Sequence, residues 1–163
     1  MWKPNLRDKA ESYAAWRGLT IMGPLGNGAD GSVWEVESKQ NTLSWALKLH
    51  HDTRPYLREK ECYERLGGAG SLAGFDVPAL LRADDQWLAL EMTIVSRPFL
   101  LDFAQAFLDE RPDFSEEVWA ERLETWREMY EDDWPLVERA LKELRGHGIY
   151  YLDVHHQNIA LAL

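Results

Sequence analysis

The sequence predicts an α+β fold in which a five-stranded antiparallel sheet with one helix is followed by a reduced helical part. Glycines and alternating polar and apolar residues fill positions 19–49, a pattern typical of consecutive strands joined by tight turns. Residues 56–66 combine many charges with apolar residues at helical spacing, which indicates a helix that ends at Gly67. From Pro98 onward, apolar residues again recur at helical spacing.

The individual elements follow from these patterns in chain order. A short amphipathic helix is predicted over residues 8–17, within an N-terminal helical extension at 1–18. Strands are predicted at residues 19–22, 32–37, 43–49, 79–82 and 87–92. Helices are predicted at residues 56–66, 100–108, 116–130 and 134–145. Strand-like sequence gives way to helical sequence near residues 93–98, which divides the chain into the parts 19–95 and 96–163.

Composition and charge exclude several classes of partner. The 163 residues carry a formal net charge of −10, which argues against binding to nucleic acid or to an anionic membrane. The single cysteine, Cys62, excludes an internal disulfide and fits a reducing compartment. No signal-peptide pattern follows Met1, and no apolar run approaches the roughly 20 residues that span a bilayer. We therefore expect a cytoplasmic protein.

The glycine-rich segment 26–33, of sequence GNGADGSV, is the first candidate binding site. In a dinucleotide-binding fold a G-x-G-x-x-G turn opens a helix, whereas the alternating Val33, Trp34 and Val36 indicate a strand. A Walker A loop needs Gly-Lys-Ser/Thr, which this segment lacks. Glycines between two strands instead make a hairpin whose N–H groups can lie over phosphates. A glycine-rich hairpin that binds nothing is the alternative.

Lys48 is the second candidate. It lies in the predicted strand 43–49 on the same face as Ala46, the face that the glycine hairpin would cover. A strand lysine that is paired with an acid can anchor a phosphate, and the following helix offers Glu59, Glu61 and Glu64. We prefer Glu59 because it stands one helical face away from the apolar residues that must pack, and Glu61 and Glu64 stay open. A lysine that simply faces solvent is the alternative.

The third candidate is a polar loop in which Asp153 and Asn158 stand five positions apart before an apolar strand. The Asp153 carboxylate can orient or accept the proton of an attacking hydroxyl, and the Asn158 oxygen can ligate Mg²⁺. A loop whose polar side chains only satisfy turns is the alternative. The adjacent His155-His156 makes a poor zinc site, because no cysteine and no i, i+4 spacing accompanies it. We interpret His50-His51 as a surface pair after a strand.

These three candidates occur in the order and at the distances found in protein kinases and related small-molecule kinases. Segment 25–33 resembles the full kinase glycine-rich loop, and Trp45–Lys48 resembles the kinase V-A-I-K strand. Segment 144–153 resembles the helix end and catalytic loop that precede the kinase aspartate, and Asp153 to Asn158 has the D-x-x-x-x-N spacing. The resemblance extends from Leu19 to the C-terminus.

The resemblance implies a protein-kinase-like fold, with 19–95 as a nucleotide-binding N-lobe and 96–163 as a partial helical C-lobe that carries the catalytic loop. It implies ATP and Mg²⁺ as cofactors and phosphoryl transfer to a hydroxyl of a protein or small molecule. The implied catalytic residues are Asp153 as base, Lys48 on the α- and β-phosphates and Glu59 as its partner, with Asn158 on the metal. The implied ATP-binding groups are Gly26, Asn27, Gly28, Gly31, Val33, Ala46, Lys48 and the hinge backbone of Glu91 and Thr93.

The sequence also departs from the kinase pattern. Tyr151-Leu152 stands where kinases have His-Arg, so control by a phosphorylated activation loop is not expected. The D-x-H that ends at His155 resembles the loop of aminoglycoside-phosphotransferase-like kinases, so the acceptor need not be a protein. No D-F-G aspartate follows Asn158. With a single Mg²⁺ ligand we expect slow transfer, because the charge of the transition state is poorly neutralised.

The segment 159–163 is apolar and follows the catalytic loop directly. In kinases the equivalent strand pairs with the strand leading to D-F-G, so here we expect an unpaired edge. We also expect a reduced helical part to leave Trp119, Trp126 and Trp134 incompletely covered. Both expectations predict a homodimer or a partner that completes the missing C-lobe; a tail that folds back along its own helices is the alternative. A catalytically inactive, pseudokinase-like scaffold module and a fragment of a longer kinase are the alternative functions.

Overall fold

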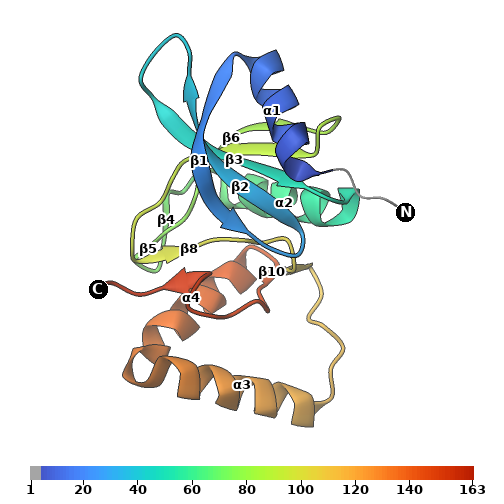
Figure 1. Cartoon of the computed structure of the whole chain (residues 1–163). Helices are drawn as coiled ribbons and strands as arrows, with labels where there is room; N and C mark the ends of the chain where they lie inside the picture. Colours follow the sequence, from blue (N-terminus) through green and yellow to red (C-terminus); the bar gives the residue numbers. More distant parts are fainter. Residues whose placement is uncertain (1–4) are drawn as a thin grey trace.

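A computed structural model describes residues 5–163 and contains a five-stranded antiparallel sheet (Figure 1). The strands, in their order across the sheet, are β1 (Leu19–Asn27), β2 (Gly31–Ser38), β3 (Ser44–His50), β7 (Ala89–Met92) and β6 (Leu80–Asp84). Each strand pairs antiparallel with its neighbour. The predicted α+β class and its antiparallel sheet are confirmed.

Helices cover both faces of this sheet. Alternation along β3 directs Leu47 and Leu49 into a core with α1 (Leu6–Arg17), and directs Ala46 into a larger core with α2 (Thr53–Leu66). The second core continues past α2 into the C-terminal helices, so it joins the two parts of the chain.

The C-terminal part consists mainly of α3 (Glu116–Tyr130) and α4 (Trp134–Gly146), joined by the short 3₁₀ helix η1 (Glu131–Asp133). Both helices agree with the prediction, and Ser115 caps α3 by accepting the Val118 N–H at 3.3 Å. The expectation of uncovered tryptophans is wrong, since the exposed fractions of Trp119, Trp126 and Trp134 are only 8%, 6% and 7%. These rings pack into the core that α3 and α4 share with α2.

The predicted helix at 100–108 is wrong. Its place is taken by two short strands, β8 (Phe99–Leu100) and β9 (Phe107–Leu108), with an irregular segment between them. Strand β9 pairs with β10 (Ile149–Tyr150), which follows α4. Strand pairing with distant segments overrides the helical tendency of the apolar residues in this segment.

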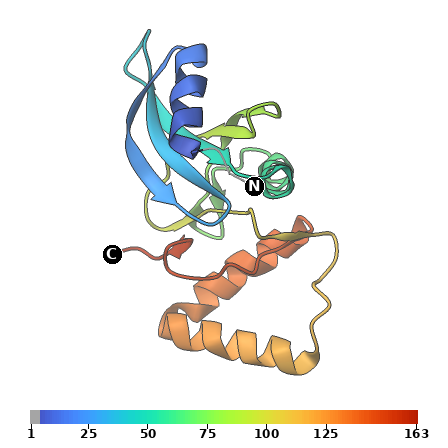
Figure 2. The ribbon, with the colours of Figure 1, turned by 45° about the vertical axis from the view of Figure 1, so that its right-hand side comes forward.

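The strand after the Asp153–Asn158 loop is paired, contrary to expectation. Strand β11 (Ile159–Ala160) lies antiparallel to β8, with Ile159 opposite Leu100, and Figure 1 shows the yellow β8 beside this red strand. The small sheet continues through β5 (Phe75–Asp76) to β4 (Ser71–Leu72). Figure 2 shows the C-terminal segment running between the large sheet and α3 and α4. The neighbour that was expected to be missing comes from earlier in the chain, which removes this reason for an added chain.

Gly31 provides a test of the hairpin geometry. A Cβ at this position would overlap the Leu49 carbonyl oxygen of β3, whereas a Cβ at Gly26 would meet nothing within 4 Å. We expect Gly31→Ala to destabilise the protein by about 1–3 kcal/mol, because the Leu49 carbonyl belongs to the backbone of the paired strand β3, which cannot move away from the new methyl group cheaply. Gly26→Ala is the matched control and should change the midpoint of urea unfolding little. Equal midpoints for the two variants would contradict this packing.

Candidate functional site

A buried group of charges surrounds Lys48. Its Nζ lies 2.7 Å from Glu59 Oε2 and 3.0 Å from Asp102 Oδ1. Lys48 comes from β3, Glu59 from α2, and Asp102 from the segment directly after β8, so three separate elements meet here. Lys48 is 5% exposed and Glu59 is 0% exposed.

Of the three candidate glutamates, the structure brings Glu59 to Lys48. Glu61 and Glu64 are exposed on the outer side of α2. The geometric reason given for Glu59 was wrong, however, because this carboxylate lies on the packed stripe of the helix and not one face away from it. The stripe consists of Tyr56, Glu59, Cys62, Tyr63 and Leu66.

The charges in this group stabilise one another. Burial alone would raise the pKa of Glu59, but the charge of Lys48 and the hydrogen bond from His50 outweigh burial and lower that pKa to about 2. Burial alone would lower the pKa of Lys48, but the carboxylates of Glu59 and Asp102 raise it. Lys48 is therefore a cation and Glu59 an anion at neutral pH.

Two members of this group were not predicted as site residues. His50 is wholly buried and its Nε2 lies 2.7 Å from Glu59 Oε2, so the interpretation of His50-His51 as a surface pair is wrong for His50. Asp102 was assigned to a helix. The sequence signal that could have found it is Leu-Leu-Asp-Phe, an apolar strand followed by an acid and an aromatic residue.

The segment after β8 is fixed on both sides of Asp102. Phe103 is wholly buried and contacts the rings of Tyr63 and Tyr151 edge-on, with centroids 5.2 and 5.6 Å away. The Tyr151 hydroxyl donates to the Leu101 carbonyl at 2.6 Å. Asp102 itself has φ 66°, a left-handed conformation that aspartate tolerates better than most residues. The backbone is thereby held in the turn that directs this carboxylate to Lys48.

Asp153 and Asn158 contact each other directly. Asn158 Nδ2 donates to Asp153 Oδ2 at 2.8 Å and to the Asp153 carbonyl at 3.1 Å. His155 adds a second contact, since its Nε2 lies 3.4 Å from Asp153 Oδ1 while its Nδ1 accepts the Gln157 N–H. The Leu101 N–H donates to the Asn158 carbonyl at 2.9 Å, which brings Asp102 next to this loop.

The two loop histidines point to different partners. His156 Nε2 lies 3.1 Å from the Met129 carbonyl, and its ring packs 4.7 Å from that of Tyr130. The Tyr130 hydroxyl donates to the Ile159 carbonyl at 2.9 Å, so α3 supports the loop and β11 together. No group of three or more His, Cys, Asp and Glu side chains suited to a metal occurs within residues 5–163.

The glycine hairpin connects β1 to β2. Gly26 and Asn27 end β1, Gly31 begins β2, and the turn between them is closed by a bond from the Gly28 N–H to the Gly31 carbonyl at 2.9 Å. Val33 and Ala46 lie on the face of the sheet that borders α2, where Lys48 also lies. Ala46 and Lys48 therefore share one face, as alternation along the strand predicted, and Val33 lies on that face as well.

The predicted hinge residues lie at the end of β7 and just after it. The Glu91 side chain points to the opposite face, where its carboxylate accepts bonds from Tyr13 at 2.6 Å, Arg17 at 2.9 Å and Trp45 at 2.8 Å. The Thr93 N–H already donates to the Ala79 carbonyl at 3.0 Å. Adenine would have to replace that bond to use the Thr93 N–H.

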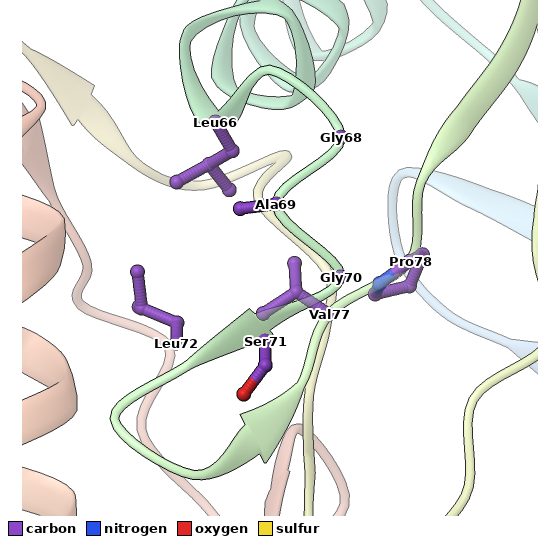
Figure 3. A pocket seen from close by; sticks show the side chains of 8 residues that line it. All are labelled: Leu66, Gly68, Ala69, Gly70, Ser71, Leu72, Val77 and Pro78. Atoms are coloured by element: carbon purple, nitrogen blue, oxygen red, sulfur yellow. The ribbon is translucent and has the colours of Figure 1, made fainter.

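Two pockets lie outside the Lys48 group. The first, shown in Figure 3, is an apolar cavity of about 10 Å³ between the end of α2 and β4, large enough for about one water molecule. The second, of about 470 Å³, lies between the start of α1 and the glycine hairpin and includes Trp34 and His51. Since Trp34 faces the α1 core, this pocket lies on the opposite side of the sheet from Lys48.

Comparison with known proteins gives no assignment for this arrangement. No family profile and no curated protein sequence matches the chain. Within residues 5–163, no helix is long and apolar enough to cross a membrane. Function must therefore be inferred from the site.

The buried charge pair predicts unequal effects for two glutamates on one helix. Glu59→Gln should destabilise the protein by about 3–5 kcal/mol, because it removes one partner of a buried ion pair. Glu64→Gln, on the exposed side of α2, should stay within about 0.5 kcal/mol of the original. Urea unfolding of both variants measures the difference, and similar losses would exclude the pairing.

The lowered pKa of Glu59 also predicts an acid-dependent loss of stability. Its pKa falls from an ordinary 4.5 to about 2 on folding, so its contribution is complete above pH 4.5 and disappears as the pH falls toward 2. The difference in unfolding free energy between the original chain and Glu59→Gln should therefore shrink over that range. A difference that stays constant from pH 6 to pH 3 would contradict this.

Proposed function

We propose that the chain binds Mg²⁺·ATP beneath the glycine hairpin and transfers a phosphoryl group to a hydroxyl acceptor. The observation that carries this proposal is the Lys48 group, in which a buried cation on the α2 face of the sheet is held between two carboxylates. Asp102 supplies a carboxylate beside Lys48 from an earlier position in the chain, which supports an active phosphotransferase.

The donor atoms near Asn158 suit Mg²⁺. Hard cations prefer carboxylate and amide oxygens, and Asp102 and Asn158 stand at the ends of the paired strands β8 and β11. Because Asn158 Nδ2 makes both bonds to Asp153, its Oδ1 is the atom left to bind a cation. Mg²⁺ held there would neutralise charge on the β- and γ-phosphates.

Asp153 is suited to the role of base. One of its carboxylate oxygens is held by Asn158 and the other by His155, which fixes the carboxylate while 40% of the side chain stays exposed. In the proposed reaction, the acceptor oxygen forms a bond to the γ-phosphorus, the bond to ADP breaks, and Asp153 takes the acceptor proton. Interactions that hold the carboxylate still favour this step because they limit reorganisation.

For a nucleotide to bind at Lys48, the lysine must exchange one of its two carboxylate partners for phosphate. Its Nζ contacts Asp102 at 3.0 Å in this structure, and neither pocket described above opens onto it. Phosphate oxygens would replace Asp102 as the second partner of Lys48, and Asp102 would turn to the metal. We expect the glycine hairpin to lift in order to admit the nucleotide.

Calorimetric titration with ATP, with and without Mg²⁺, tests this proposal. Lys48→Met should weaken binding about 10- to 100-fold under both conditions, because it removes a charged hydrogen-bond donor. Asp102→Asn should weaken binding chiefly when Mg²⁺ is present. Asp113→Asn, an exposed position on the C-terminal part, is the matched control. Asp153→Asn should leave ATP binding intact. It should abolish ATP hydrolysis, the reaction in which water takes the place of the hydroxyl acceptor.

The possible failures separate the parts of the proposal. No heat and no thermal shift at millimolar ATP would exclude nucleotide binding altogether. Mg²⁺-dependent binding without any turnover would instead favour an inactive nucleotide-binding module. Equal turnover by the original chain and Asp153→Asn would exclude Asp153 as the base.

A further inference from the structure

His50 contacts the same carboxylate oxygen as Lys48. It ends β3 two residues after Lys48, and alternation places both side chains on the α2 face of the sheet. His50 is 0% exposed, and its ring lies edge-on to Tyr56 with centroids 5.5 Å apart. Its Nε2 and the Lys48 Nζ each lie 2.7 Å from Glu59 Oε2. Glu59 therefore has two strong donors from one strand.

Both ring nitrogens of His50 face groups that only accept hydrogen bonds. Nε2 faces the Glu59 carboxylate, and Nδ1 lies 3.2 Å from the Leu88 carbonyl oxygen. A neutral imidazole has one N–H, and the charged acceptor is the stronger partner, so that hydrogen belongs on Nε2. A protonated ring would satisfy both acceptors. In either form, Nε2 donates to Glu59.

The remaining contacts of Glu59 are weaker. The Tyr63 hydroxyl and the Phe103 N–H both lie 3.4 Å from Oε1, at the limit of hydrogen bonding. The charges around His50 are Lys48 from β3, Glu59 from α2 and Asp102 from the segment after β8, while Tyr56 and Leu88 present uncharged groups. If the exchange of Asp102 for phosphate drew Lys48 away from Glu59, His50 would be the strong donor that remains on Glu59 among the contacts described.

We propose that His50 is a positioning residue that holds Glu59, and with it α2, in the site while Lys48 exchanges Asp102 for phosphate. The docking of α2 by His50 needs no nucleotide. Only the role during binding rests on the proposed function. In this arrangement the pairing of α2 with the sheet does not depend on Lys48 alone.

Two substitutions separate donation by His50 from packing. Gln can present an N–H near the position of Nε2, whereas Leu fills the space without a donor. We expect His50→Leu to raise the hydrogen-exchange rates of α2 amides at least tenfold and His50→Gln to restore most of the protection. The effect should grow in a Lys48→Met background, where His50 is the main support of Glu59. His51→Leu, at the neighbouring position, is the matched control for exchange and for Mg²⁺·ATP affinity.

Equal exchange rates for His50→Gln and His50→Leu would overturn the inference, because packing alone would then explain them. If His50→Leu does not fold, the ¹⁵N signals of the His50 ring in the unaltered chain decide: a proton on Nε2 supports the proposal, and a neutral ring protonated on Nδ1 overturns it. Altered α2 exchange in a chain that never binds ATP would leave the docking role standing and remove the proposed function. Unchanged α2 exchange in His50→Leu, in a chain that binds ATP, would remove the docking role of His50 and leave the proposed function standing.

Discussion

A buried lysine needs compensation for its charge, and Lys48 obtains it from two carboxylates that belong to different parts of the chain. The contact of Glu59 with Lys48 holds α2 against the sheet. The contact of Asp102 with Lys48 holds the segment after β8 at the same place. The positions of α2 and of the C-terminal part relative to the sheet therefore depend on the same cation. Phe103, the residue next to Asp102, reinforces this arrangement because its ring packs between Tyr63 of α2 and Tyr151, which precedes the Asp153–Asn158 loop.

The order of the elements along the chain differs from their order in space around the Lys48 group. Strand β8 and the acid after it, Asp102, occur before α3, yet β8 lies against β11, which follows the Asp153–Asn158 loop at the far end of the described chain. Pairing of strands depends on register and burial and not on which strand comes first. Segments that are far apart in the sequence can therefore bring their side chains to one site.

Local patterns predicted what depends on local sequence. Alternation predicted the strands and the shared face of Ala46 and Lys48, and helical spacing predicted α2, α3 and α4. The segment 100–108 could not be predicted in this way, since its apolar residues fit a helix and its strands exist only through distant partners. Asp102 was missed for the same reason. His50 was missed because a polar residue at a strand end is usually exposed, and its burial becomes favourable only through distant partners, the Glu59 carboxylate on α2 and the Leu88 carbonyl.

The early position of β8 has a consequence for synthesis of the protein. Lys48 and Asp102 are separated by 54 positions, and both precede α3. The large sheet, α2 and the whole Lys48 group therefore leave the ribosome before α3 and α4. At about 5–20 residues per second, the remaining segment takes several seconds to follow. During that interval one edge of β8 has no strand beside it, and an open edge invites pairing with another nascent chain. Rapid arrival of β11 would thus protect the newly made protein from association with its own copies.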